Sequence, residues 1–262
     1  MQKPTNELSI EESLRQTMRL YLNNFLTFFV PLLVATLVSE VASTILSDYF
    51  SLGEFPEVGA GAEAWNLFFS RMEALIIATL AIFIISLVAS AIAEGVCIRK
   101  ASDLIEKGTT ITKDALNLAV RKLLPLLAAT ILIAIVVGAG LVALIVPGIV
   151  FAIMFSLMIP LILIEDAKVF DSLSKSQKLV SNRWLKTFGF YAAIAITVFF
   201  GVMVAVFISA PFGVFGSLAR SIVMSIIASV AAPLVPIALT VHYYSMKARE
   251  QERILLPPPP MF

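Results

Sequence analysis

Long apolar segments separated by short charged clusters dominate this chain. The clearest runs cover Phe25–Ile45, Ala74–Cys97, Thr187–Ala210 and Ile222–Tyr244. Each is about 20 residues or longer, which is the length that an α-helix needs to cross the hydrocarbon core of a bilayer. The pattern therefore predicts four transmembrane helices in these segments.

The longest stretch without a charged residue, Leu123–Ile164, is too long to be one such helix. As a single helix it would extend roughly 63 Å, about twice the thickness of the hydrocarbon core. Pro147-Gly148 offers a place to turn, because proline lacks an N–H group and glycine tolerates turn geometry. The stretch thus predicts two spans, Leu126–Val146 and Ile149–Ile164, and six spans in all.

The basic residues predict the orientation of these spans. With the N-terminus inside, all of the 19 Lys and Arg residues except Arg71 and Arg220 fall in inner segments. The positive-inside rule then places both termini in the cytoplasm of a cell-membrane protein. The long, acidic segment Ser47–Arg71 becomes an outer loop, with a short helix expected at Ala62–Phe69.

A repeated motif precedes alternate spans. Glu12–Leu26 matches Asp171–Leu185 in one register, with identities that include Ser13/Ser172 and Leu20/Leu179. Asp114–Leu116 fits the same register before the third span. Each segment has apolar residues at helical spacing, which is typical of an amphipathic helix. Basic amphipathic helices lie in the membrane interface.

The predicted fold class is therefore all-α: a polytopic bundle of six transmembrane helices in a single transmembrane domain. It is expected to consist of three helical-hairpin repeats, each preceded by an interfacial amphipathic helix. The repeats cover about 9–98, 110–164 and 168–246, and a cytoplasmic tail covers 247–262. The four-proline run in this tail favours an extended conformation, and either an unstructured tail or a docking peptide for a protein partner fits it.

Composition agrees with a membrane protein and narrows its chemistry. Hydrophobic residues make up 59% of the chain and charged residues 14%, with a net charge of +1. This balance predicts membrane lipids as partners and no nucleic acid. Cys97 and His242 are the sole cysteine and histidine, so no internal disulfide, metal site or cofactor is expected. Enzyme motifs are absent, which makes catalysis the less favoured reading.

Ionisable residues near the spans are the candidate functional residues. Three are acidic: Glu94 near the inner end of the second span, Glu40 near the outer end of the first, and Glu165 at the end of the fourth. Three basic residues, Arg19, Arg121 and Lys178, occupy equivalent positions of the repeat. The carboxylates can bind cations, relay protons or pair with these bases, or they can be solvated among lipid headgroups.

The stretch from Pro147-Gly-Ile149 through Pro160 and Glu165 to Asp171–Leu179 resembles a group of uncharacterised prokaryotic six-helix membrane proteins. This group includes the membrane domain attached to some glycerophosphodiester phosphodiesterases. The resemblance covers about Leu123–Leu185 and implies a six-helix fold. The phosphodiesterase domain itself is absent, so its activity does not transfer.

Three functions remain open on these grounds. The first is a non-catalytic protein that organises the membrane or binds lipids or a partner. The second is a transporter or channel for ions or small solutes, with Glu94, Glu165 and the three bases lining an inner cavity. The third is a membrane subunit of a lipid-active enzyme, which rests on family analogy alone.

The topology makes a direct prediction. Single cysteines introduced between Gly53 and Gly61 should react with a membrane-impermeant maleimide added outside intact cells. Labelling that occurs only after the cytoplasmic side is exposed would contradict the orientation.

Overall fold

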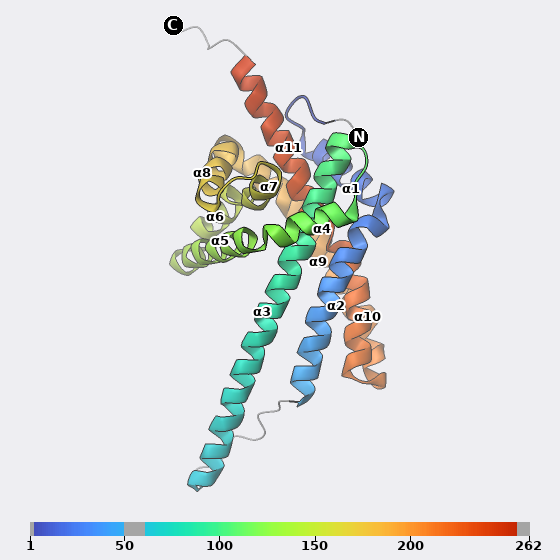
Figure 1. Ribbon diagram of the computed structural model, residues 1–262, viewed down its shortest axis with the longest axis vertical. Helices are drawn as coiled ribbons and strands as arrows, with labels where there is room; N and C mark the ends of the chain where they lie inside the picture. Colours follow the sequence, from blue (N-terminus) through green and yellow to red (C-terminus); the bar gives the residue numbers. More distant parts are fainter. Residues whose placement is uncertain (1–2, 50–60, 256–262) are drawn as a thin grey trace.

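The computed structural model describes residues 3–49 and 61–255, which form helices and their connections (Figure 1). The all-α prediction is confirmed for this part of the chain. In chain order the helices are α1 Ile10–Asn23, α2 Phe25–Tyr49, α3 Ala62–Lys107, α4 Thr112–Arg121, α5 Leu123–Ala143, α6 Ile145–Met154, α7 Met158–Ile164, α8 Val169–Val180, η1 Ser181–Arg183, α9 Trp184–Ser209, η2 Ala210–Phe215, α10 Ser217–Ala231 and α11 Leu234–Leu255. Residues 50–60 of the predicted outer loop, and the proline run, lie outside the described residues.

Six helical segments in the described ranges are long and apolar enough to cross a membrane. This confirms the predicted number of spans by length and composition. The second span is longer than expected, because the helix predicted at Ala62–Phe69 continues directly into it as the start of α3.

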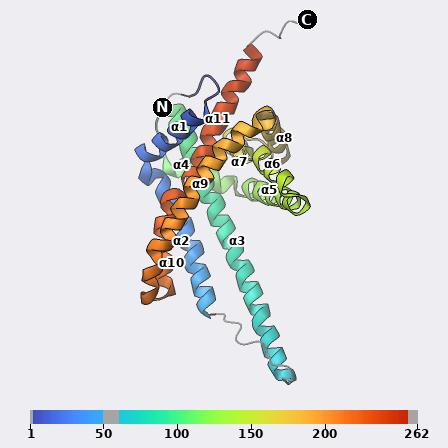
Figure 2. The same ribbon diagram turned by 180° about the vertical axis from the view of Figure 1, so that it is seen from behind.

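The helices meet at one end of the molecule and diverge from it. Figures 1 and 2 show α2, α3 and α10 leaving this end along the long axis, whereas α5 and α6 run across that axis. We call the packed end the hub. It consists of α1, α7, α8 and α11 together with the adjoining ends of α2, α3 and α9, and its core residues include Tyr21, Phe28, Cys97, Leu161, Val180, Phe190, Ile237 and Met246.

Outside the hub, the spans expose large apolar side chains. The exposed fraction is 60% for Phe83 on α3, 90% for Val142 on α5 and 75% for Phe207 on α9. Water-soluble proteins rarely expose apolar surface on this scale. The divergent parts of the spans therefore require a bilayer around them.

The breaks between helices differ from the sequence prediction in position. The turn between α5 and α6 is made by Leu144, which is extended at φ −161° and ψ 142°. Pro147 instead lies in the first turn of α6, where its missing N–H group costs nothing. Gly148 is needed for packing, since its backbone contacts Gly140 of α5.

The predicted fourth span is also interrupted, between α6 and α7. Ser176 of α8 satisfies the backbone at this break: its hydroxyl donates to the Met154 carbonyl oxygen (2.6 Å) and accepts from the Leu157 N–H (3.2 Å). A serine one helix away thus stabilises the interruption, which the sequence of the span itself does not signal.

The predicted sixth span is divided at Pro233 into α10 and α11. α11 also extends into the predicted tail as far as Leu255. At the start of this extension, Lys247 and Arg249 form ion pairs with Glu165 and Glu7.

The short helices α1, α4 and α8 each pack on the last helix of another hairpin: α1 on α11, α4 on α3 and α8 on α7. All three bury small side chains at matching positions of the predicted repeat. These pairs are Ser13 with Thr17, Ala115 with Ala119, and Ser172 with Ser176.

The contact between α5 and α6 can be tested at one position. A methyl group added at Gly140 would lie 2.8 Å from the Gly148 Cα atom, so one backbone must move. We expect Gly140→Ala to lower stability by about 1–3 kcal/mol, measured as a lower melting temperature in detergent. Gly138→Ala is the matched control, because nothing lies within 4 Å of the added methyl group. Equal melting temperatures for the two variants would contradict this packing.

Candidate functional site

Glu165, at the end of α7, is the centre of an ion-pair cluster. Its carboxylate lies 2.8 Å from Lys247 Nζ and 3.1 Å from Lys175 Nζ, and it accepts a hydrogen bond of 2.8 Å from the Tyr243 hydroxyl. Lys175 belongs to α8, and the other two partners belong to α11. This predicted site residue therefore joins three helices, and its charge is neutralised within the protein.

Glu7, just before α1, forms a second cluster that sequence reasoning missed. Its carboxylate lies 2.7 Å from Lys186 Nζ, 3.3 Å from Arg183 Nε and 3.8 Å from Arg249 Nε. Arg183 is the last residue of η1, Lys186 lies in the first turn of α9, and Arg249 belongs to α11. The cluster ties the N-terminal segment to two helices that follow it by more than 170 residues.

The remaining polar groups of α11 extend this cross-linking. His242 shares a hydrogen bond with the Thr187 hydroxyl of α9 (3.1 Å), and the Tyr244 hydroxyl contacts Ser102 (2.7 Å) and Glu106 (2.9 Å) of α3. Ser245 Oγ accepts from the Leu8 N–H (2.9 Å). In the sequence, polar residues are frequent from His242 to Arg249, directly after an apolar span. This pattern could have identified the run as a region of polar contacts between helices.

The two clusters favour ionised carboxylates. Burial opposes ionisation of Glu165, but hydrogen bonds from Lys247, Tyr243 and Lys175 outweigh it and hold its pKa below the ordinary value. Burial likewise opposes ionisation of Glu7, and the hydrogen bond from Lys186 with the nearby positive charges lowers its pKa. Both groups thus serve as structural anions.

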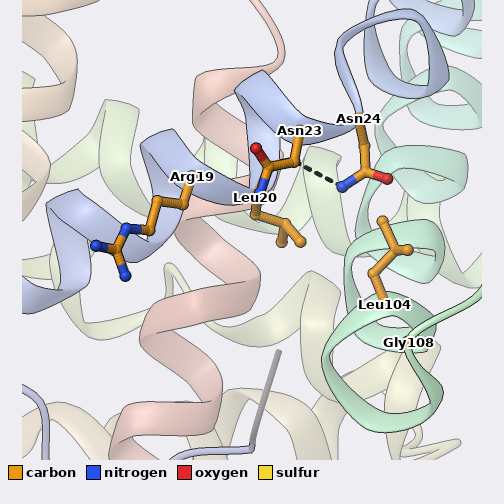
Figure 3. A pocket seen from close by; sticks show the side chains of 6 residues that line it. All are labelled: Arg19, Leu20, Asn23, Asn24, Leu104 and Gly108. Carbon is orange, nitrogen blue, oxygen red and sulfur yellow. Dashed lines mark hydrogen bonds between the residues drawn. The ribbon is translucent and has the colours of Figure 1, made fainter.

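The three predicted basic residues are not brought together. Arg19, Arg121 and Lys178 are each exposed, on α1, α4 and α8 respectively. Arg19 borders a cavity of about 320 Å³ between α1 and the end of α3, and Figure 3 shows its side chain directed away from Leu104 and Gly108. Leu20 and Asn24 also line this cavity, and the Asn24 side-chain amide donates a hydrogen bond of 3.1 Å to the Leu20 carbonyl oxygen.

Arg121 borders a separate cavity of about 350 Å³, which also contacts Arg99 and Asp114. Arg19 and Arg121 thus border different cavities in the described part of the chain.

The other two predicted acids stand apart from these clusters. Glu94 is half-buried on α3, and within the described ranges its carboxylate forms no hydrogen bond or ion pair. Glu40 is half-buried on α2, where its backbone carbonyl accepts from the Thr44 hydroxyl at 2.9 Å. Neither is joined to Arg19, Arg121 or Lys178.

A further feature that sequence reasoning missed is an apolar groove between α2 and α3. Its volume is about 620 Å³, and the start of α4 borders it at the hub end. Lys100, only 2% exposed, is the one charged residue that lines this groove. No group of His, Cys, Asp and Glu that could hold a metal ion occurs in the described part of the chain.

Comparison with known proteins adds no assignment: no protein-family description, curated protein or solved structure matches this chain.

The ion-pair clusters predict a pH dependence of stability. Because the pKa values of Glu7 and Glu165 are lowered in the folded protein, their stabilisation is complete above the unfolded value of about 4.3 and is lost as pH falls below it. We expect the melting temperature in detergent to fall steeply below about pH 4.5. The double variant Glu7→Gln/Glu165→Gln should melt lower at pH 7 and show a weaker acid dependence.

The exposed Glu11, which pairs only with Arg15 in its own helix, provides the control. Glu11→Gln should change neither the melting temperature at pH 7 nor its acid dependence. An unchanged profile in the double variant would show that the clusters do not stabilise the hub.

Proposed function

We propose that this chain is a non-catalytic multi-pass membrane protein that organises lipids at the cytoplasmic surface of the cell membrane. The observation that carries the proposal is the separation of two kinds of surface. Away from the hub the spans expose large apolar side chains, whereas the exposed basic residues Arg19, Arg121 and Lys178 lie on the short helices α1, α4 and α8, in or beside the hub.

The orientation follows from the charges of the hub. Nearly all basic residues belong to segments at or beside it, and the positive-inside rule places such segments in the cytoplasm. The hub then contacts the leaflet that carries anionic lipids.

The three short helices support contact with headgroups. In addition to Arg19, Arg121 and Lys178, they expose apolar side chains such as Met18, Leu22, Leu116 and Phe170. A helix with both kinds of side chain on its free surface suits the boundary between headgroups and acyl chains. The equivalent packing of α1, α4 and α8 supports three hairpin repeats that present this surface three times.

Transport is the second candidate, and one observation favours it: the half-buried, unpaired carboxylate of Glu94. Two other observations favour the lipid-organising function over transport: Glu165 is ion-paired, and the three bases lie apart from one another. The likeness to phosphodiesterase-associated membrane domains stays a prediction, and so does a role as a membrane subunit of a lipid-active enzyme.

The proposal is tested with the full chain in liposomes of phosphatidylcholine and phosphatidylglycerol. Energy transfer from a fluorophore on the protein to headgroup-labelled lipid measures which lipid surrounds the hub. We expect phosphatidylglycerol to be enriched. Each basic residue near an anionic surface contributes about 1 kcal/mol, so Arg19→Gln/Arg121→Gln/Lys178→Gln should reduce the enrichment strongly.

Arg71→Gln/Arg220→Gln removes exposed charge on the opposite side and is the control, with no expected effect. Equal amounts of both lipids around the wild-type hub would overturn the proposal. Proton or potassium flux in the same liposomes, lost in Glu94→Gln, would establish transport instead.

A further inference from the structure

The groove between α2 and α3 has the shape and chemistry of a lipid-chain site. It follows α2 from Leu26 to Val38, which is about 18 Å of helix at 1.5 Å per residue. Its α3 wall includes Ala89, Ala93 and Val96, whose small side chains leave the space open. Its volume of about 620 Å³ lies within the range of small-molecule pockets.

Lys100 closes the groove at the hub end through a contact that a proline creates. Pro31 of α2 has no N–H group, so the carbonyl oxygen of Thr27, one turn earlier, has no helical donor. Lys100 Nζ donates to this oxygen at 3.0 Å. The contact places a cationic group of α3 between the two helices, at the end of the apolar groove.

The charge of Lys100 is not balanced by the protein. An ammonium group has three N–H donors, and within the described residues the Thr27 oxygen accepts from one of them. Asp103, three residues further along α3, binds Arg99 and Lys107, and the unpaired Glu94 does not line the groove. A buried charge without a counter-ion is costly, so an anion beside Lys100 would stabilise this site.

The start of α4 offers further donors at the same place. Thr112, the first residue of α4, lines the groove, and no side chain caps this helix end. Free N–H groups in the first turn of a helix favour an anion. Two residues earlier, the buried hydroxyl of Thr110 has no hydrogen-bond partner among the described residues, although Thr110 does not itself line the groove. Asp114 of the same turn borders the other cavity, with Arg99 and Arg121.

We propose that this groove binds one anionic phospholipid, with an acyl chain between α2 and α3 and the phosphate against Lys100 and the first turn of α4. The inference deepens the proposed lipid-organising function by assigning a defined lipid site. It differs from the general enrichment of lipid around the hub, because Arg19, Arg121 and Lys178 do not line this groove.

A lipid is the occupant that the surroundings favour. The groove is open along the apolar faces of two spans, where Leu26, Val30, Val34 and Val38 are exposed. In a bilayer, acyl chains occupy that region, and phosphates lie at the ends of the spans where Lys100 is found. The apolar wall and the single cation match the two parts of one phospholipid.

Native mass spectrometry of the full chain, purified from mixed phosphatidylcholine and phosphatidylglycerol liposomes, tests the site. Wild type should retain one phospholipid, with phosphatidylglycerol preferred. Lys100→Met should reduce this preference on the order of tenfold or more, because it removes the positive charge that favours the net-anionic headgroup over the zwitterionic one. Val34→Trp, which fills the groove from an exposed position, should abolish retention of either lipid.

Two controls separate the site from its surroundings. Lys178→Met removes one exposed charge on α8, and Leu80→Trp adds the same bulk to an exposed position of α3 outside the groove. Both should retain the lipid. If Lys100→Met does not fold, as judged by size-exclusion chromatography, Val34→Trp decides the question.

The proposal is overturned if wild type retains no lipid, if both lipids are retained equally, or if Val34→Trp retains as much lipid as wild type. A dimer that Val34→Trp dissociates would assign the groove to a second copy and also overturn it. The two experiments distinguish failure of the lipid-site proposal from failure of the proposed lipid-organising function. Lys100→Met should leave the enrichment around the hub unchanged, and the triple variant should leave the retained lipid unchanged.

Discussion

The polar run His242–Arg249 of α11 is the feature on which the arrangement of the other helices depends. Its side chains bind α3 through Tyr244, α7 and α8 through the Glu165 cluster, α9 through His242, and the segment before α1 through Ser245 and Arg249. One short stretch thus cross-links all three hairpins at one end. Because hydrogen bonds and ion pairs are directional, they define how the helices meet more strictly than apolar contact does.

The divergence of the spans away from this end has a physical basis in the membrane. Between two helices in lipid there is no hydrophobic driving force, so close packing and polar contacts hold them together. The structure uses both, with the Gly140–Gly148 approach between α5 and α6 and hydroxyl contacts such as Thr36–Ser229 between α2 and α10. Where such close contacts and hydrogen bonds are absent, the apolar side chains of the spans are exposed to the surrounding lipid.

The charged groups divide into those that hold the hub together and those that face outward. Glu7 and Glu165 are neutralised by bases from other parts of the chain, so their ion pairs hold these segments together. Arg19, Arg121 and Lys178 remain exposed, and Lys100 remains buried without a carboxylate. Cationic groups beside apolar surface are suited to anionic lipids, which connects the proposed function to the groove between α2 and α3.

The sequence by itself determined the helical class and the six apolar spans, because length and apolar periodicity are local properties of the chain. The equivalence of Arg19, Arg121 and Lys178 in a repeat stays a prediction. The sequence located the turn before α6 only to within a few residues, since Pro147 is as acceptable in a first helical turn as in a loop. Only the tertiary structure decided that Glu165 is ion-paired, that Glu94 is not, and that Pro31 and Lys100 meet across two helices. Such contacts join residues far apart in the chain, and they depend on how helices pack rather than on where each helix begins.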